Sequence, residues 1–65
     1  QQLIDAIQQL TDEQRDVVLM RFIEGFDIQS VARALNKKPG AIKGLQFRAL
    51  RALAALMQET GAGGR

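Results

Sequence analysis

The stretch from Pro39 to Leu53 most constrains what this chain can fold into, because it has the pattern of a helix with two chemically different faces. At about 100° per residue around a helix, one stripe is apolar and comprises Ile42, Leu45, Ala49, Leu53 and Leu56. The opposite side gathers Lys43, Phe47, Arg48 and Arg51. Any small helical domain needs an inward-facing apolar stripe, but folding does not require a basic outer face with an aromatic ring. We therefore look for function on that outer face.

Length and composition restrict the classes of protein to consider. The chain has 65 residues, so we expect one small domain or a piece of a longer protein. It contains no cysteine and no histidine, which excludes disulfides, thiolate or imidazole metal ligands and most nucleophile–base pairs. We expect no metal, no cofactor, no small-molecule substrate and no enzymatic activity. No segment resembles a membrane span or a signal peptide, which favours a cytoplasmic protein without membrane contacts.

Acidic and basic residues are separated along the sequence. Six of the seven acidic residues precede Ile28, whereas seven of the nine basic residues follow Asp27. The net charge of +2 conceals this asymmetry. It predicts that the C-terminal part meets a polyanion while the N-terminal part has another role.

Two helices are predicted in the first half of the sequence. Residues 1–10 place four aliphatic residues at helical spacing, which favours a short amphipathic helix. The segment from Thr11 to Gln14 has the form of a capping box, in which each side chain accepts from the backbone amide of the other residue. A second helix should therefore begin near Asp12.

The second helix has an unusual apolar pattern. Between Val17 and Ile23 it is apolar nearly all the way round, which predicts a position at the centre of the bundle, surrounded by other elements. Gly25 should end it by adopting a left-handed conformation.

The second half of the sequence predicts a helix-turn-helix. Asp27 is a suitable N-cap for a helix over residues 28–35, and Asn36 can adopt the left-handed conformation that ends it. Pro39 suits the first position of a last helix, which we expect to run to about Gln58. Two helices joined by such a short turn can place the second helix in a DNA major groove.

Together these elements predict an all-α, compact four-helix domain over residues 1–60, with the helix-turn-helix at its C-terminal end. Residues 61–65 lack side chains that can pack, and we expect them to form a disordered tail. The sequence has no strand pattern, no internal repeat and no sign of a second domain.

Single exposed lysines and arginines need no functional explanation, but Phe47 lies opposite the apolar stripe. A structural role would require packing against something outside this domain, whereas a functional role would be contact with a thymine methyl group or a sugar. Glycine inside a helix costs up to about 1 kcal/mol relative to alanine. We expect tight packing against the preceding helix to explain Gly40, and close approach of the backbone to a ligand to explain Gly44.

Further basic residues lie close to this helix in the sequence. Lys37 and Lys38 adjoin the amides at the start of the helix, which together can hold a DNA phosphate. Arg33 can also contact a phosphate, or its side chain can simply lie along the surface of its own helix. With Arg51 on the outer face, these residues are the candidate phosphate contacts.

Taken together, the residues resemble region 4 of bacterial sigma factors, and the pattern is that of the extracytoplasmic-function group. The sequence pattern of that group is roughly LxxEQRxVxxLRxxEG, followed by IAxxL and then by GTVKSRxxRAxxxL. The matching segments here are Leu10–Gly25 (LTDEQRDVVLMRFIEG), Ile28–Leu35, Gly40–Lys43 and Arg48–Leu53. The short Gly25–Asp27 junction is typical of the same group, and the resemblance extends from about Ile4 to Leu56.

This resemblance implies a function and partners. Members of the group form the C-terminal domain of a sigma factor, and their last helix binds the −35 promoter element in the major groove to direct transcription initiation. Their first helices and core dock on the flap of the RNA polymerase β subunit. Many are held inactive by an anti-sigma factor that covers this domain.

Position by position, the resemblance assigns DNA-base contacts to Lys43, Gly44, Phe47 and Arg48, and phosphate contacts in the turn to Lys37 and Lys38. The sequence departs from the family pattern at three positions. Lys38 stands where Ser or Thr usually caps the helix, Gly44 replaces a common Ser, and Leu45 replaces a common Arg. We therefore expect a recognition helix that reads DNA with fewer polar side chains than is usual in the family.

Two other functions fit parts of the pattern. The output domain of a response regulator or quorum-sensing activator also has four helices, but such domains dimerise through the last helix. A protein-interaction module would use Phe47 as an anchor in the groove of a partner. An enzyme is the least favoured class, because no acid–base or nucleophile constellation is present.

Overall fold

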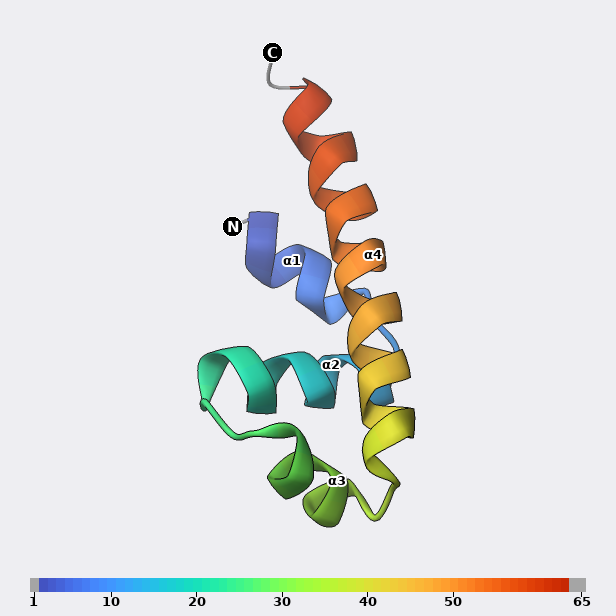
Figure 1. The fold of residues 1–65 in the computed structure, drawn as a ribbon. Coiled ribbons are helices and arrows are strands. Elements are labelled where there is room, and N and C mark those ends of the chain that lie inside the picture. Colours follow the sequence, from blue (N-terminus) through green and yellow to red (C-terminus); the bar gives the residue numbers. More distant parts are fainter. Residues whose placement is uncertain (1, 64–65) are drawn as a thin grey trace.

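The computed structural model describes residues 2–63, with side chains for residues 3–58, and the regular secondary structure in this part of the chain is all helical. The elements are α1 (Gln2–Gln8), α2 (Asp12–Val18), the π-helical turn η1 (Leu19–Ile23), α3 (Ile28–Leu35) and α4 (Pro39–Gly63). Figure 1 shows α4 as a long helix with α1, α2 and α3 arranged along one side of it. The predicted all-α, four-helix architecture with a C-terminal helix-turn-helix is confirmed.

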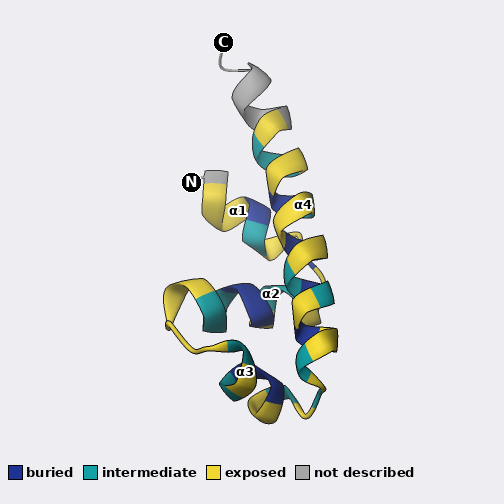
Figure 2. Cartoon of the chain, viewed as in Figure 1, coloured by how far each residue is buried: buried dark blue, intermediate teal, exposed yellow. Residues whose placement is uncertain are grey.

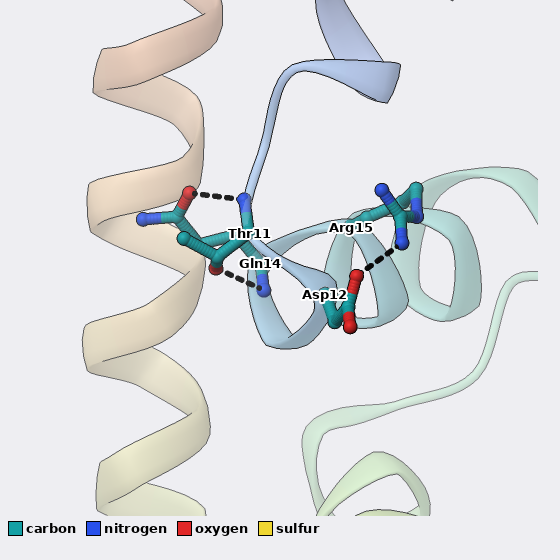
Figure 3. Close-up of polar contacts among 4 residues, drawn as sticks. All are labelled: Thr11, Asp12, Gln14 and Arg15. Carbon is teal, nitrogen blue, oxygen red and sulfur yellow. Dashed lines mark hydrogen bonds and ion pairs between the residues drawn. The ribbon is translucent and has the colours of Figure 1, made fainter.

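The predicted capping box begins α2 (Figure 3). The Gln14 amide donates to the Thr11 hydroxyl over 3.2 Å, and the Thr11 amide donates to the Gln14 side-chain oxygen over 3.3 Å. Asp12 and Glu13 occupy the first turn, where their negative charges interact favourably with the positive end of the helix dipole. Arg15 pairs with Asp12 one turn away, so the start of α2 is defined by its own local contacts.

The prediction that the second helix is surrounded throughout its length is wrong for its C-terminal part. Val17 and Val18 are buried, but Phe22 is 49% exposed and Ile23 is 66% exposed. The reason is the direction of the helix, because η1 continues α2 away from α4 (Figure 1) and none of its residues is buried by the part of the chain that the structure describes. Gly25 then ends the helix with a φ of 81°, the predicted left-handed conformation.

The helix-turn-helix is built by local signals. The Asp27 carboxylate caps α3 by accepting from the Ser30 amide over 2.8 Å. Asn36 adopts the left-handed conformation with a φ of 57°. The amides of Lys37 and Asn36 donate to the Ala32 and Arg33 carbonyls, respectively, which is the bond pair of a Schellman motif. Only residues 36–38 separate α3 from α4.

The last helix begins at Pro39, as predicted, but it extends to Gly63, beyond the predicted end at about Gln58. Most of the segment expected to form a disordered tail, residues 61–63, is therefore helical, and residues 64 and 65 lie outside the described residues. Among the residues described, no helix combines the length and apolar character needed to cross a bilayer.

The core consists of two clusters arranged along α4. One joins α1 and α2 to the later part of the helix and comprises Ala6, Leu10, Val18, Ala49 and Leu53. The other joins α2 and α3 to its beginning and comprises Val17, Val31, Ala32, Ile42 and Leu45. The buried stripe of α4 is the one predicted from the sequence, with Leu56 half-buried at its end.

The burial of Ile42 gives a test of the fold. Its side chain has no exposed surface, so Ile42→Ala should lower the free energy of unfolding by about 2–5 kcal/mol through lost burial and a cavity. Phe47→Ala on the same helix removes an exposed ring and should change it by less than about 1 kcal/mol. Urea unfolding followed by circular dichroism measures both, and equal effects would contradict the assignment of the two faces.

The cap of α3 predicts a dependence on pH. The hydrogen bond from the Ser30 amide lowers the pKa of Asp27 below its ordinary value of 3.8, helped by the positive charges of Arg33 and Arg21. Because protonation is easier in the unfolded chain, this stabilisation is complete above pH 3.8 and is lost as the pH falls through the lowered pKa. Asp27→Ala should lower the Tm at neutral pH, and its difference from wild type should shrink on acidification.

Asp27→Asn is the matched control, because asparagine also caps helices but carries no charge. It should lower the Tm less than Asp27→Ala does. A difference between wild type and Asp27→Ala that stayed constant down to pH values well below 3.8 would contradict a role for the carboxylate charge.

Candidate nucleic-acid interface

As far as Gln58, the side of α4 that faces away from the other helices is mostly exposed (Figure 2). Lys43, Arg48 and Arg51 are exposed there, and Phe47, which lies among them, is 62% exposed. Leu50, which the sequence analysis did not single out, is exposed one turn beyond Phe47. The face is therefore basic with an apolar centre, which suits a surface that presents both charged donors and methyl contacts.

Two arginines on this face fold back one turn towards the start of the helix. The Arg48 guanidinium lies over Gly44, since a Cβ added to that glycine would be 3.4 Å from Arg48 Nη1. The Arg51 guanidinium carbon lies 5.6 Å from the centre of the Phe47 ring, within the range of a cation–π contact. The structure thus brings these four predicted site residues together as two pairs.

The glycine predictions have different outcomes. A Cβ added to Gly40 would meet no atom within 4 Å, so tight packing against the preceding helix is not the reason for this glycine. It lies in the first turn of α4 with an exposed surface. Gly44 is half-buried, and the Arg48 side chain accounts for its close neighbours within the chain.

The turn before α4 carries the remaining candidates. Lys38 is exposed, and its carbonyl accepts from the Ile42 amide at the start of the helix. Lys37 is half-buried and forms an ion pair with Glu13 of α2, with 2.6 Å between Nζ and Oε2. Arg33 is exposed on α3 and contacts Ser30 of its own helix. Lys37 and Lys38 directly precede α4, at whose beginning backbone amides lack helical partners.

Arg21, which no local sequence pattern singles out, links η1 to α4. Arg21 donates from Nε to the Gln46 side-chain oxygen over 3.0 Å and from a terminal nitrogen to the Phe26 carbonyl over 2.8 Å. Its guanidinium also lies 5.4 Å from the Phe22 ring centre. Arg21 therefore joins the end of α2, the following loop and α4. Local sequence patterns do not predict such a contact, because Arg21 and Gln46 are 25 residues apart.

A second exposed apolar surface lies at the end of η1 and in the loop that follows, and comprises Phe22, Ile23 and Phe26. With Phe47, all three phenylalanines of the chain are exposed. Aromatic side chains usually contribute strongly to cores and interfaces. The core here uses none of them, which favours contacts with other molecules at two separate places.

Among the described residues, no group of three or more acidic side chains is placed to hold a metal ion. The shifted pKa of Asp27 comes from its capping role at the start of α3.

Comparison with known proteins identifies the family of the chain. The family model for region 4 of sigma-70 matches residues 1–53, and the chain belongs to this family. It is similar to the ECF RNA polymerase sigma factor BldN of Streptomyces coelicolor, with 42% identity over 88% of this chain and 22% of the relative. It is also similar to the ECF RNA polymerase sigma factor SigX of Bacillus subtilis, with 40% identity over 82% of this chain and 27% of the relative.

A solved structure supports the same fold. A chain in the structure of the RsbN–BldN complex superimposes with a TM-score of 0.81 at 44% identity, over 83% of this chain and 39% of that chain. The chain thus spans less than a third of each curated relative. The resemblance to region 4 of extracytoplasmic-function sigma factors is confirmed.

The surroundings of Gly44 predict the stability of a variant. In Gly44→Ala the new Cβ would make ordinary contact with the flexible end of Arg48, while alanine favours the helix by up to about 1 kcal/mol. The Tm should therefore rise, by up to about 4–8 °C for a domain of this size. Calorimetry on this variant and on Gly40→Ala, where the added Cβ meets open space, provides the comparison. A lower Tm for Gly44→Ala alone would show that Arg48 cannot adjust.

Proposed function

We propose that the chain recognises the −35 promoter element as the C-terminal domain of an RNA polymerase sigma factor and so directs transcription initiation. The observation that carries this proposal is the basic, partly apolar face of α4, presented by a helix-turn-helix in a member of the sigma-70 region 4 family. A recognition helix of this kind lies in the major groove, with its early residues at the base edges. Such a domain has no catalytic step of its own and acts in the cytoplasm.

The proposed contacts divide into two groups. Base contacts are assigned to Lys43, Gly44, Phe47 and Arg48, in the first three turns of α4. Lysine and arginine donate to guanine, and an exposed ring can contact a thymine methyl group. Phosphate contacts are assigned to Arg33, Lys37, Lys38 and Arg51, which surround that face or precede it in the chain. These contacts would set the position of the helix and the dependence of binding on salt.

A protein partner accounts for the other exposed surface. We propose that Phe22, Ile23 and Phe26 contribute to docking on the flap of the RNA polymerase β subunit, since the mainly acidic N-terminal half has little attraction for DNA. An anti-sigma factor is proposed as a further partner. The similar chain in the RsbN–BldN complex, which is bound to another protein, supports binding of a protein by this fold.

Substitutions can separate base reading from phosphate attraction. Arg48→Ala should reduce discrimination between the preferred and a scrambled duplex by about 1–3 kcal/mol if it contacts a base. Lys38→Ala should weaken binding to both duplexes nearly equally and reduce the salt slope by about one unit. Fluorescence anisotropy at several salt concentrations measures both effects, after selection of the preferred sequence from a random DNA pool with core polymerase. Unchanged discrimination in Arg48→Ala would contradict the assignment of the recognition helix.

Gly44→Ala gives a complementary test, because this variant should be at least as stable as wild type. If the DNA backbone or a base approaches Gly44 closely, the added methyl group should reduce affinity by several-fold although the domain remains folded. Lost binding could then not be attributed to unfolding. Unchanged affinity would mean that Gly44 does not contact DNA. The glycine would then serve only to make room for the Arg48 side chain.

A further inference from the structure

The ion pair between Lys37 and Glu13 links the turn of the helix-turn-helix to a distant part of the chain. The 2.6 Å contact joins Lys37 Nζ to Glu13 Oε2 in the first turn of α2. The side chain of Lys37 is 30% exposed, whereas that of Glu13 is 57% exposed. Of the four residues assigned to phosphates, Lys37 alone forms an ion pair with a carboxylate among the residues whose side chains are described.

The carboxylate of Glu13 binds the Lys37 ammonium as a DNA phosphate would. Both ligands offer anionic oxygens to a compact charge with three donors. An exposed ion pair of this kind contributes only about 0.2–1 kcal/mol, so it can be displaced. DNA gains in addition from the release of condensed counterions when a lysine neutralises a phosphate.

We propose that Glu13 is an internal competitor for the phosphate contact of Lys37 and thereby sets the affinity of the domain for DNA. In the free protein Glu13 holds the ammonium, and on binding the phosphate replaces the carboxylate. The Glu13 carboxylate then lies near the phosphate without a neutralising ammonium. The repulsion between these two negative charges adds to the cost of losing the ion pair. Both effects weaken sequence-independent attraction and leave base contacts to decide where the domain binds. This inference rests on the proposed function, because it requires DNA at the turn.

A double-mutant cycle tests the competition. Affinity for a short duplex is measured by fluorescence anisotropy at low salt for wild type, Glu13→Gln, Lys37→Met and the double variant. Glu13→Gln should raise affinity about 1.4- to fivefold, the range given by the strength of an exposed pair. Lys37→Met should lower affinity, and in that background Glu13→Gln should lose most of its effect.

Asp16→Asn is the matched control, because Asp16 is another exposed acid on α2. This variant measures how much affinity for DNA changes when one negative charge is lost from α2 and the ion pair is kept. The increase from Glu13→Gln should exceed that from Asp16→Asn in the wild-type background and equal it in the Lys37→Met background. Glu13→Asp keeps the charge but shortens the reach, so it should also raise affinity. Circular dichroism confirms that each variant is folded.

The outcomes are distinguishable. Equal increases from Glu13→Gln with and without Lys37 would overturn the competition and leave only general charge repulsion. A decrease would mean that Glu13 positions Lys37 for DNA, which also overturns it. If folded wild type bound no duplex even at low salt, the proposed function itself would fail.

Discussion

The structure depends on one constraint, namely that a single apolar stripe on α4 must serve two separate clusters. Ile42 and Leu45 belong to the cluster with α3, whereas Ala49 and Leu53 belong to the cluster with α1. The second helix connects the clusters, because Val17 faces one of them and its neighbour Val18 faces the other. Adjacent residues point about 100° apart on a helix, so α2 must cross α4 where one cluster meets the next (Figure 1).

The position of the outer face follows from this arrangement. When the inner stripe is buried, the direction of every outer side chain of α4 is determined, since the helix is continuous from Pro39 onward. Burial of Leu45 belongs to the same arrangement, because the residue lies on the stripe that holds α3. The face that remains presents Lys43, Arg48, Arg51 and the Phe47 ring, and the hydrogen bond from Arg21 to Gln46 links α4 to η1.

Most of the fold could be predicted because its signals are local. The capping box at Thr11, the left-handed Asn36 and the proline at the start of α4 each act within a few residues. The candidate surface was predictable for a related reason, because helical periodicity separates inner from outer residues. Contacts across more than twenty residues, such as those of Arg21 and Glu13, leave no local pattern. The exposure of Phe22 and Ile23 was also missed, because apolar character alone does not reveal that a helix extends past its neighbours.

The division of the core into two clusters has a consequence for how the molecule opens. The cluster that holds α1 shares no buried residue with the cluster that holds α3. Of the α1 residues whose side chains are described, only Ala6 is buried in this cluster, while Leu3 and Ile4 are exposed. Local opening energies follow the buried contacts of each unit. Detachment of α1 should therefore require less free energy than global unfolding, and we expect amide hydrogens of α1 to exchange with solvent while those of the helix-turn-helix remain protected.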